Sequence, residues 1–461
     1  MYNIDFSLTY RKNMNENEFE QQNNEASENE EVITESLSEE IASTDGSDKE
    51  QEQVLEKNVQ QKPQKQYVIS YFKAVALVLL TAILVFQATY LGVSQKYQRQ
   101  LKQLVNVGFS EAKIQEISRI YKDNYIYDYS EDDILNGLIY GFIAGTGDRH
   151  GRYYTAEEFK SFTASLNDRA VGIGVIVGHN TVENSIEIYK VYKDSPADKS
   201  GIKAGDHILA VEGKYLTEVG YDKASDLILG QIGTDVLLTV KNESGTSQIK
   251  VTRNEYTTTS VDYSLIDGNI GYIKIENFYA STPNELKDAV SQLKQQKANS
   301  VVFDLRGNTG GSLSSIKGTL EYMLPEGDMF KIINKAKNEE VFTSKGPGFD
   351  MPAVVLVNGS TASAAELFTS ALMDYDIAVS VGTKTYGKGS VSEPFRLSDG
   401  SYIYLSSGLY YPPKSDNFDK IGITPDHVVD LSKEASKISL YKLAYEDDDQ
   451  LKYAVGLLKN K

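Results

Sequence analysis

A serine and a lysine in the C-terminal third of this 461-residue sequence have the surroundings of a nucleophile and its base. Ser363 stands between an apolar, strand-like run and a helix-like segment at 364–373. A serine at that position is exposed, and the N-terminus of a helix stabilises negative charge. An oxyanion formed when Ser363 attacks a carbonyl group can accept a hydrogen bond from the N–H of Ala364. These features make Ser363 a candidate nucleophile.

Lys388 is the candidate base. It lies between Gly387 and Gly389, which permit a tight turn, and apolar strand-like segments stand on either side. A free lysine has a pKa of about 10.4 and stays charged at neutral pH. Burial in an apolar pocket, with no carboxylate beside the amine, lowers that pKa to about 7–8 and makes the amine a working base. The chemistry open to such a pair is acyl transfer through a serine ester.

Both residues also have plain structural interpretations. Ser363 and Glu366 fit a capping box, in which a serine and a glutamate three residues later satisfy the first N–H groups of a helix. Most lysines are solvated surface residues, and this reading applies to Lys388 as well. A second pair, Ser314 and Lys317, has the Ser-x-x-Lys spacing of penicillin-binding enzymes, but the other two motifs of those enzymes are missing from the sequence. We set that second pair aside.

The candidate pair must be positioned by the segment from Ile270 onward, where strand-like and helix-like patterns alternate. We expect strands at 271–275, 300–305, 353–357 and 379–383, and helices at 283–293, 315–323 and 364–373. The run at 300–305 is almost wholly apolar, as in a sheet that is covered on both faces. It ends in the glycine-rich loop 306–311, where backbone N–H groups can approach a ligand closely. The pattern predicts an α/β fold.

A separate, β-rich module is expected at 168–256. Its first strand-like run is broken by two glycines, and glycine-marked turns follow at 201–213. This spacing resembles a PDZ domain. The resemblance implies a groove beside Gly172, Ile173 and Gly174, where a partner's C-terminal peptide adds as an extra strand. The two glycines also fit a β-bulge or part of a dinucleotide-binding loop, but the helix that such a loop requires does not follow.

The first 93 residues are expected to form a disordered acidic tail and a membrane span. Residues 1–66 are rich in Glu, Gln, Asn and Ser and have few large apolar residues to collapse around. Residues 68–93 are almost wholly apolar, and 74–92 carry no charge, which is enough for a transmembrane helix. A cleaved signal peptide and a buried core helix are the alternatives. The distance of the run from the N-terminus disfavours the first, and the polar flanks disfavour the second.

The region between the span and the module, 97–167, places apolar residues at helical spacing and predicts an N-terminal helical region. Within it, Thr155 and Glu158 fit a capping box at the start of a helix that ends near Leu166. We expect this region to pack against the catalytic part of the chain.

Composition removes several classes of function. The formal net charge is −18 and no basic face is apparent, which argues against a nucleic-acid partner. The sequence has no cysteine, which excludes disulfides, thiol catalysis and thiolate metal sites. Its four histidines stand far apart, without a His-Glu-x-x-His spacing, so we expect no metal site. No cofactor is implied.

Four motifs follow the PDZ-like module in order, at 272–278, 304–311, 363–366 and 387–389. Together with that module they resemble the carboxyl-terminal processing peptidase family over roughly residues 106–461. The resemblance implies a Ser–Lys dyad of Ser363 and Lys388 on a crotonase-like (ClpP/crotonase-type) α/β peptidase core at 257–461. The separation of 25 residues (388 − 363) matches the family's serine-to-lysine spacing.

The resemblance also implies oxyanion donors at Ala364 and Gly310, and a PDZ domain that presents substrate C-termini. This sequence departs from the family in two places. Ser392 stands four residues after the lysine, where the family usually has a glutamine that orients it. Ser392 is a candidate to bond the amine instead, directly or through water. The loop Gly147–Gly151 replaces a Pro-Tyr-Ser-like turn, and we expect that change to affect only local loop shape.

The leading hypothesis is a membrane-anchored serine endopeptidase that processes or degrades proteins recognised by their C-terminal ends. Its partners would be proteins or peptides with accessible C-termini and the membrane, and a homodimer is left open. Basic residues are nearly balanced across the span, so the expected activity decides the orientation: single-pass in the cell membrane, with the tail cytoplasmic and the catalytic part extracytoplasmic. The alternatives are a catalytically silent PDZ scaffold, which Ser392 favours, and a regulatory protease that cuts one partner.

Overall fold

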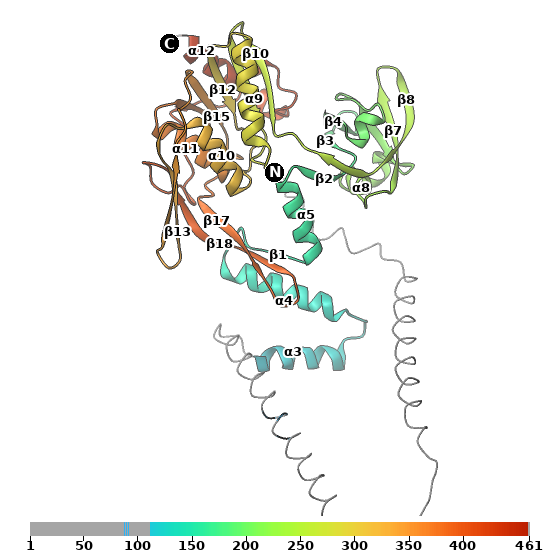
Figure 1. Cartoon of the computed structure of the whole chain (residues 1–461). Helices are drawn as coiled ribbons and strands as arrows, with labels where there is room; N and C mark the ends of the chain where they lie inside the picture. Colours follow the sequence, from blue (N-terminus) through green and yellow to red (C-terminus); the bar gives the residue numbers. More distant parts are fainter. Residues whose placement is uncertain (1–86, 88, 90, 92–110, 460–461) are drawn as a thin grey trace, which may run out of the picture. The chain divides into compact units, whose positions relative to one another are not determined.

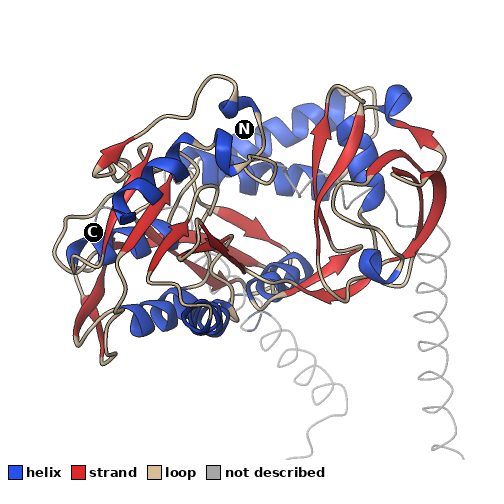
Figure 2. Ribbon diagram, turned by 90° about the horizontal axis from the view of Figure 1, so that it is seen from above, coloured by secondary structure: helices blue, strands red, loops and turns tan. Residues whose placement is uncertain are grey.

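The computed structural model describes residues 87, 89, 91 and 111–459 (Figure 1). The expected acidic tail, 1–66, lies outside the described residues, and so does the expected span, 68–93, apart from three single positions. Within the part of the chain that is described, no helix is both long enough and apolar enough to cross a membrane. The described residues form a mixed α/β structure (Figure 2).

The chain divides into two compact units, 1–131 and 132–461. The first unit contains helix α3, Glu111–Asn124, whose side chains from Ala112 onward are exposed. Helix α4, Glu131–Thr146, begins at the last residue of that unit. All elements described below belong to the second unit.

A six-stranded sheet forms the centre of the second unit, in the order β10-β11-β12-β15-β16-β19. Its strands are β10 Val261–Ile266, β11 Ile270–Ile275, β12 Ser300–Asp304, β15 Ala353–Val357, β16 Ala378–Gly382 and β19 His427–Val428. Every neighbouring pair is parallel except β10 with β11. The strands predicted at 271–275, 300–305, 353–357 and 379–383 are confirmed to within a residue.

Helices cover both faces of this sheet (Figure 1). They are α9 Thr282–Gln295, α10 Leu313–Met323 and α11 Ala364–Asp374 on one face, and α12 Asp449–Lys459 on the other. Residues of β15 alternate between the two cores: Val355 packs with α9 to α11, whereas Val354 and Leu356 pack with α12. This period of two explains why the buried strands read as continuous apolar runs in the sequence.

A second, antiparallel sheet was not predicted from the sequence. It has the order β1-β18-β13-β14, and β17 also pairs with β18. Its strands are β1 Arg152–Tyr154, β13 Gly327–Asn334, β14 Glu339–Ser344, β17 Ser390–Arg396 and β18 Tyr402–Tyr411. The region expected to be helical, 97–167, therefore also contributes a strand. Its capping box is confirmed: Thr155 and Glu158 exchange hydrogen bonds of 2.8 and 3.2 Å at the start of α5, Ala156–Leu166.

The middle module has a core of its own. Its sheet has the order β3-β4-β5-β7-β8, with strands β3 Val175–Asn180, β4 Ser185–Val191, β5 His207–Val211, β7 Asp235–Asn242 and β8 Gly245–Thr252, and with β6 Lys214–Tyr215 beside β5. Its helices are α6 Pro196–Lys199, α7 Leu216–Val219 and α8 Tyr221–Ile228. Strands β2 Arg169–Gly172 and β9 Asn254–Thr257, where the chain enters and leaves, pair with each other. The expected glycine break is present, because β2 ends at Gly172 and β3 begins at Val175.

Candidate active site

Ser363 lies in a strained turn between β15 and α11. Its φ angle is +59°, in a region that residues with a side chain seldom adopt. The residue is only 9% exposed, so the expectation of an exposed serine was wrong. Strained backbone of this kind concentrates at functional sites. Ala364 is the first residue of α11, so its N–H has no acceptor within the helix. The turn therefore offers a serine beside a donor that the helix does not use.

The buried carboxylate of Glu366 joins this turn to the segment that carries Lys388. It accepts the N–H of Ser363 (2.9 Å) and the N–H of Lys388 (2.8 Å) on Oε2. Its Oε1 accepts the N–H of Gly387 (2.7 Å) and the hydroxyl of Thr385 (2.5 Å). Burial raises the pKa of Glu366, and these four hydrogen bonds oppose that shift. Glu366 thus does more than cap its own helix: it holds the backbone of both candidate residues.

The surroundings of Lys388 favour the neutral form of its amine. Its side chain is half-buried, and its amine makes no hydrogen bond or ion pair with any residue that the structure describes. Burial lowers the pKa of the Lys388 amine, and the positive charge of Arg152 lowers it further, whereas Asp148 acts in the opposite direction. The expectation of a desolvated amine is consistent with this environment, although a carboxylate does lie within electrostatic reach.

Ser392 lies on β17, paired with Ser406 of β18 next to a β-bulge at Val391. Its hydroxyl is buried and has no hydrogen-bond partner among the described residues. The structure therefore does not bring Ser392 into a direct hydrogen bond with Lys388, although sequence reasoning named it as the candidate for that contact.

The loop at 147–152 lies closer to Lys388 than the sequence suggested. Both oxygens of the Asp148 carboxylate accept hydrogen bonds from Ser406, from its N–H and its hydroxyl, each at 2.9 Å. Asp148 also accepts the N–H of His150 at 3.0 Å. Burial lowers the pKa of His150, and the charge of Lys388 lowers it further. Four charged or titratable side chains within the five residues 148–152 were the available signal, whereas the sequence prediction for this loop was only a change of local shape.

Gly310 packs directly against the candidate nucleophile. Its φ is +107°, and a Cβ atom added there would lie 2.8 Å from the Cβ of Ser363, so only glycine fits. Two hydrogen bonds tie the glycine loop to the serine turn: Ala362 N–H to the carbonyl of Asn308, and the Thr361 hydroxyl to the carbonyl of Leu305, both 2.9 Å. The glycine loop is therefore part of the same site.

The N–H of Gly310 is already in use, because it donates to Oδ1 of Asn308 at 2.8 Å. Oxyanion binding by Gly310 would require this bond to be exchanged. Of the two expected oxyanion donors, Ala364 is thus the one whose N–H is not claimed by a side chain of the neighbouring loop.

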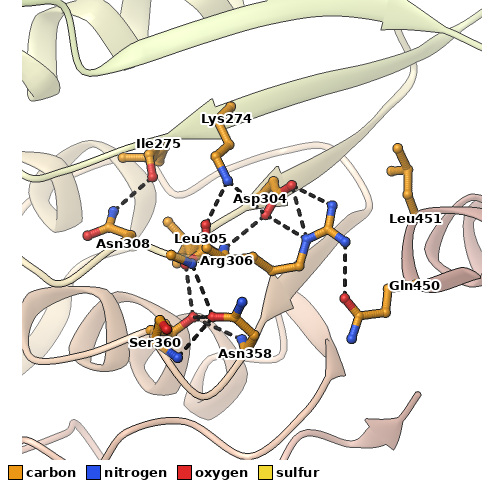
Figure 3. Close-up of polar contacts among 12 residues, drawn as sticks. Lys274, Ile275, Asp304, Leu305, Arg306, Asn308, Asn358, Ser360, Gln450 and Leu451 are labelled. Atoms are coloured by element: carbon orange, nitrogen blue, oxygen red, sulfur yellow. Dashed lines mark hydrogen bonds and ion pairs between the residues drawn. The ribbon is translucent and has the colours of Figure 1, made fainter. Parts of the chain in front are cut away.

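A buried cluster of polar side chains around Arg306 holds the start of the glycine loop, and Figure 3 shows its Asp304 and Gln450 members. The guanidinium of Arg306 bonds the carboxylates of Asp304 and Asp448, both at 2.7 Å, and the amide oxygen of Gln450 at 3.0 Å. Burial opposes ionisation of Asp304, but the charges of Arg306 and Lys274 and the hydrogen bonds from Arg306 and Tyr272 together hold the pKa of Asp304 well below its usual range. On the other side of the loop, Asn308 donates to the carbonyl of Ile275 at 2.9 Å.

The residues expected to form the peptide groove lie at the start of the module's edge strand. β3 pairs only with β4 among the described strands, so its other edge is open to an added strand. Ile173 is 3% exposed, and its carbonyl accepts the N–H of Ala197 at 2.8 Å. The carbonyl of Gly174 accepts the N–H of Tyr192 at 3.0 Å. These bonds fix the loop that precedes the open edge.

The second Ser-x-x-Lys pair has ordinary surroundings. Ser314 and Lys317 are both exposed on α10. The Lys317 amine lies over the ring of Phe342, 5.6 Å from its centroid. Nothing in these contacts indicates catalysis.

Comparisons with known proteins relate this chain to a peptidase family and to PDZ domains. The model of peptidase family S41 matches residues 269–429, and a PDZ domain model matches 187–242. A probable CtpA-like serine protease of Staphylococcus epidermidis is 30% identical over 364 residues, which cover 78% of this chain and 73% of that protein. A probable CtpA-like serine protease of Staphylococcus aureus is 29% identical over 395 residues, which cover 83% and 78%. Among solved structures, the photosystem II D1 C-terminal processing protease is 23% identical, covers 70% of this chain and 87% of that chain, and has a TM-score of 0.43.

Proposed function

This chain belongs to the carboxyl-terminal processing peptidases of family S41, which are serine-type peptidases, and we propose that Ser363 is its nucleophile and Lys388 its general base. In the acylation step the Lys388 amine takes the proton of the Ser363 hydroxyl as Oγ attacks the peptide carbonyl. The proton then passes to the leaving amine, and an acyl-enzyme forms. In the second step water, deprotonated by Lys388, releases the acyl group and restores the serine.

The observation that carries this assignment is the Glu366 carboxylate, which bonds the backbone N–H of both residues. Burying a carboxylate costs desolvation free energy, and four hydrogen bonds to it fix the relative positions of the groups that donate them. The lowered pKa of Lys388, caused first by burial and then by Arg152, is the second support, since only the neutral amine accepts a proton.

We assign the N–H of Ala364 as an oxyanion donor, because it stands next to Ser363 at the helix N-terminus. Gly310 is the second expected donor. Its N–H bonds Asn308 at 2.8 Å in the free protein, so this role requires substrate to draw the N–H away from Asn308. The core that carries these groups is expected to be crotonase-like.

The PDZ domain is proposed to select substrates by capturing their C-terminal ends on the open edge of β3, beside Gly172, Ile173 and Gly174. The accompanying expectation is that the enzyme processes or degrades proteins with accessible C-termini. Peptides with a free C-terminal carboxylate and the same peptides as amides test this directly: only the free acids should compete with a protein substrate.

Membrane anchoring by residues 68–93, with the tail in the cytoplasm, is a further proposal. Because the chain has no cysteine, a single cysteine introduced in the tail or near the C-terminus is a unique label site. A membrane-impermeant maleimide added to intact cells should label the C-terminal cysteine and spare the tail cysteine. The reverse pattern, or extraction of the protein by salt alone, would contradict the proposal. Sedimentation velocity in detergent distinguishes a monomer from a homodimer, which the sequence leaves open.

The catalytic assignment is tested with the full-length protein in detergent and casein as an unstructured substrate. We expect cleavage by the wild type and none by Ser363→Ala or Lys388→Ala, whereas Lys384→Ala, which alters an exposed lysine four residues away, should keep wild-type activity. Cleavage by Ser363→Ala at the wild-type rate would contradict the assignment. A wild type that stays inactive even with C-terminal peptides bound would favour a silent PDZ scaffold.

A further inference from the structure

The turn that carries Lys388 is held entirely through its backbone. Ser392, the side chain expected to orient the amine, has no hydrogen-bond partner among the described residues. Instead, three consecutive N–H groups donate to two carboxylates. Those of Gly387 and Lys388 go to Glu366, and that of Gly389 goes to Oδ1 of Asp419 at 3.1 Å.

Asp419 belongs to a short loop, 415–423, that holds Gly389 on two sides. In this loop Asn417 donates its amide to the carbonyl of Gly389 at 3.0 Å, while Asp419 accepts the N–H of Gly389. The side-chain oxygen of Asn417 accepts the N–H of Asp419 at 2.8 Å, which joins the two. Phe418 stands between them, 4% exposed, in the same core as α11. A buried anchor therefore sets the position of both polar side chains.

Gly389 is what permits this close approach. A Cβ atom at that position would lie 2.5 Å from the N of Asp419 and 2.7 Å from Nδ2 of Asn417. Any other residue would push the loop away and break both bonds. The loop and the Lys388 turn thus fit together as backbone against backbone.

We propose that Asp419, together with Asn417, is a positioning residue for Lys388. This loop fixes the position of the Lys388 turn, whereas the side chain of Ser392 forms no hydrogen bond to the Lys388 amine. The inference rests on the proposed role of Lys388 as the base. Held by Glu366 on one side and Asp419 on the other, the turn keeps the amine half-buried. If the Asp419 bond is lost, the turn opens toward water and the amine recovers an ordinary hydration shell.

The consequence is a defined change in pH dependence. A rehydrated Lys388 has a higher pKa, so a smaller fraction is neutral at pH 7 and activity is recovered only at higher pH. The charged or titratable groups that act near this amine are Arg152, Asp148 and His150 from the loop before β1, and Glu366 and Asp419 from its two backbone supports.

The test is the pH profile of kcat/KM for labelled casein, measured on full-length protein in detergent. Asp419→Ala should lose about 10- to 100-fold at pH 7, and the midpoint of its rise with pH should move up by about one unit or more. Asp419→Asn keeps an oxygen acceptor and should restore most of the activity and the wild-type midpoint. Asp416→Ala, an exposed carboxylate of the same loop, should match the wild type.

Asn417→Ala, which removes the other bond to Gly389, should shift the midpoint in the same direction and serves if Asp419→Ala does not fold. A loss in Asp419→Ala that is equal at every pH, with an unmoved midpoint, would overturn the inference. So would an Asp419→Asn variant as impaired as the alanine variant. Ser363→Ala and Lys388→Ala are measured alongside: if they retain activity, the proposed function fails, whereas if only the Asp419 midpoint is unmoved, this inference fails alone.

Discussion

The backbone N–H groups of Ser363 and Lys388 donate to the same atom, Oε2 of Glu366, at 2.9 and 2.8 Å. The two residues are separated by a helix and a strand in the sequence, and this one oxygen joins the turns that carry them. A shift of either turn would cost a buried charge-assisted hydrogen bond. The relative placement of the proposed nucleophile and the proposed base thus depends on the hydrogen bonds of one carboxylate.

Glu366→Gln should therefore be severely impaired. The amide oxygen of glutamine can accept hydrogen bonds from two of the four donors. The amide N–H₂ would lie against the other two donors and could not accept their hydrogen bonds. We expect an activity loss of about 100-fold or more and a loss of unfolding free energy of about 2–4 kcal/mol, measured by casein cleavage and by thermal melting. Glu321→Gln is the matched control, because that glutamate on α10 accepts a single, exposed N–H. Wild-type cleavage by Glu366→Gln would contradict the positioning role.

Gly310→Ala should inactivate the enzyme through a direct clash with Ser363. The added methyl group would sit 2.8 Å from the Cβ of Ser363, in a backbone conformation that already disfavours alanine. Gly307→Ala separates the two effects: its φ is +81°, but nothing lies within 4 Å of the added atom. Casein cleavage should fall about 100-fold or more for Gly310→Ala and by less than about 10-fold for Gly307→Ala. Equal losses would mean that backbone strain alone explains the effect.

Lys388→Met should gain stability while losing activity. The folded-state pKa of Lys388 lies below its ordinary 10.5, so the unfolded chain binds more protons between these two values and stability rises with pH there. The protein is most stable with respect to this group above pH 10.5, where the amine is neutral in both the folded and the unfolded chain. This stability is lost as the pH falls through the folded-state pKa. Removing the amine should thus stabilise by about 1 kcal/mol at pH 7, an effect that shrinks as the pH is raised.

Thermal melts at pH 6.5, 8 and 9.5 measure that difference. Lys384→Met, at an exposed position in the same segment, should show no gain at any of these pH values. A gain for Lys388→Met that grows with pH would contradict the assigned direction. The same pKa predicts that wild-type kcat/KM rises with pH through a midpoint below 10.5.

Arg306→Met should destabilise the protein by about 3–5 kcal/mol, because it leaves the buried carboxylates of Asp304 and Asp448 without their main counter-charge. Adding Asp448→Asn to that variant removes one stranded charge, so the double variant should recover part of the loss. Urea unfolding measures both, with Arg396→Met as an exposed control on β17. A double variant that is less stable than Arg306→Met would show that the two groups are not coupled in this way.

The central sheet was largely predictable from the sequence. The strand at 353–357 was confirmed because it is a wholly apolar run with clear flanks. The helix from Ala364 was confirmed because its apolar residues recur at helical spacing. The second sheet was missed for the opposite reason. The sequence showed a strand-like segment after Lys388, but Pro394 and the charged residues of β17 obscure its extent, and its pairing with β18 has no local signal.

The candidate residues were predictable, but their supports were not. Motif spacing indicated Ser363 and Lys388, yet no local pattern relates Glu366 to the N–H groups of 387 and 388. Asp148 bonds Ser406 across 258 positions of sequence. Such contacts depend on how distant loops fold together, and a single sequence carries no signal for them.

The most direct test of the central claim is the rate at which a fluorophosphonate labels the full-length protein at pH 8, with the modified peptide identified by mass spectrometry. The dyad predicts a single adduct on Ser363, labelling slowed by about 100-fold or more in Lys388→Ala, and an unchanged rate in Lys384→Ala. An adduct on another residue, or a Lys388→Ala variant that is labelled at the wild-type rate, would contradict the assignment of Ser363 as nucleophile and Lys388 as its base.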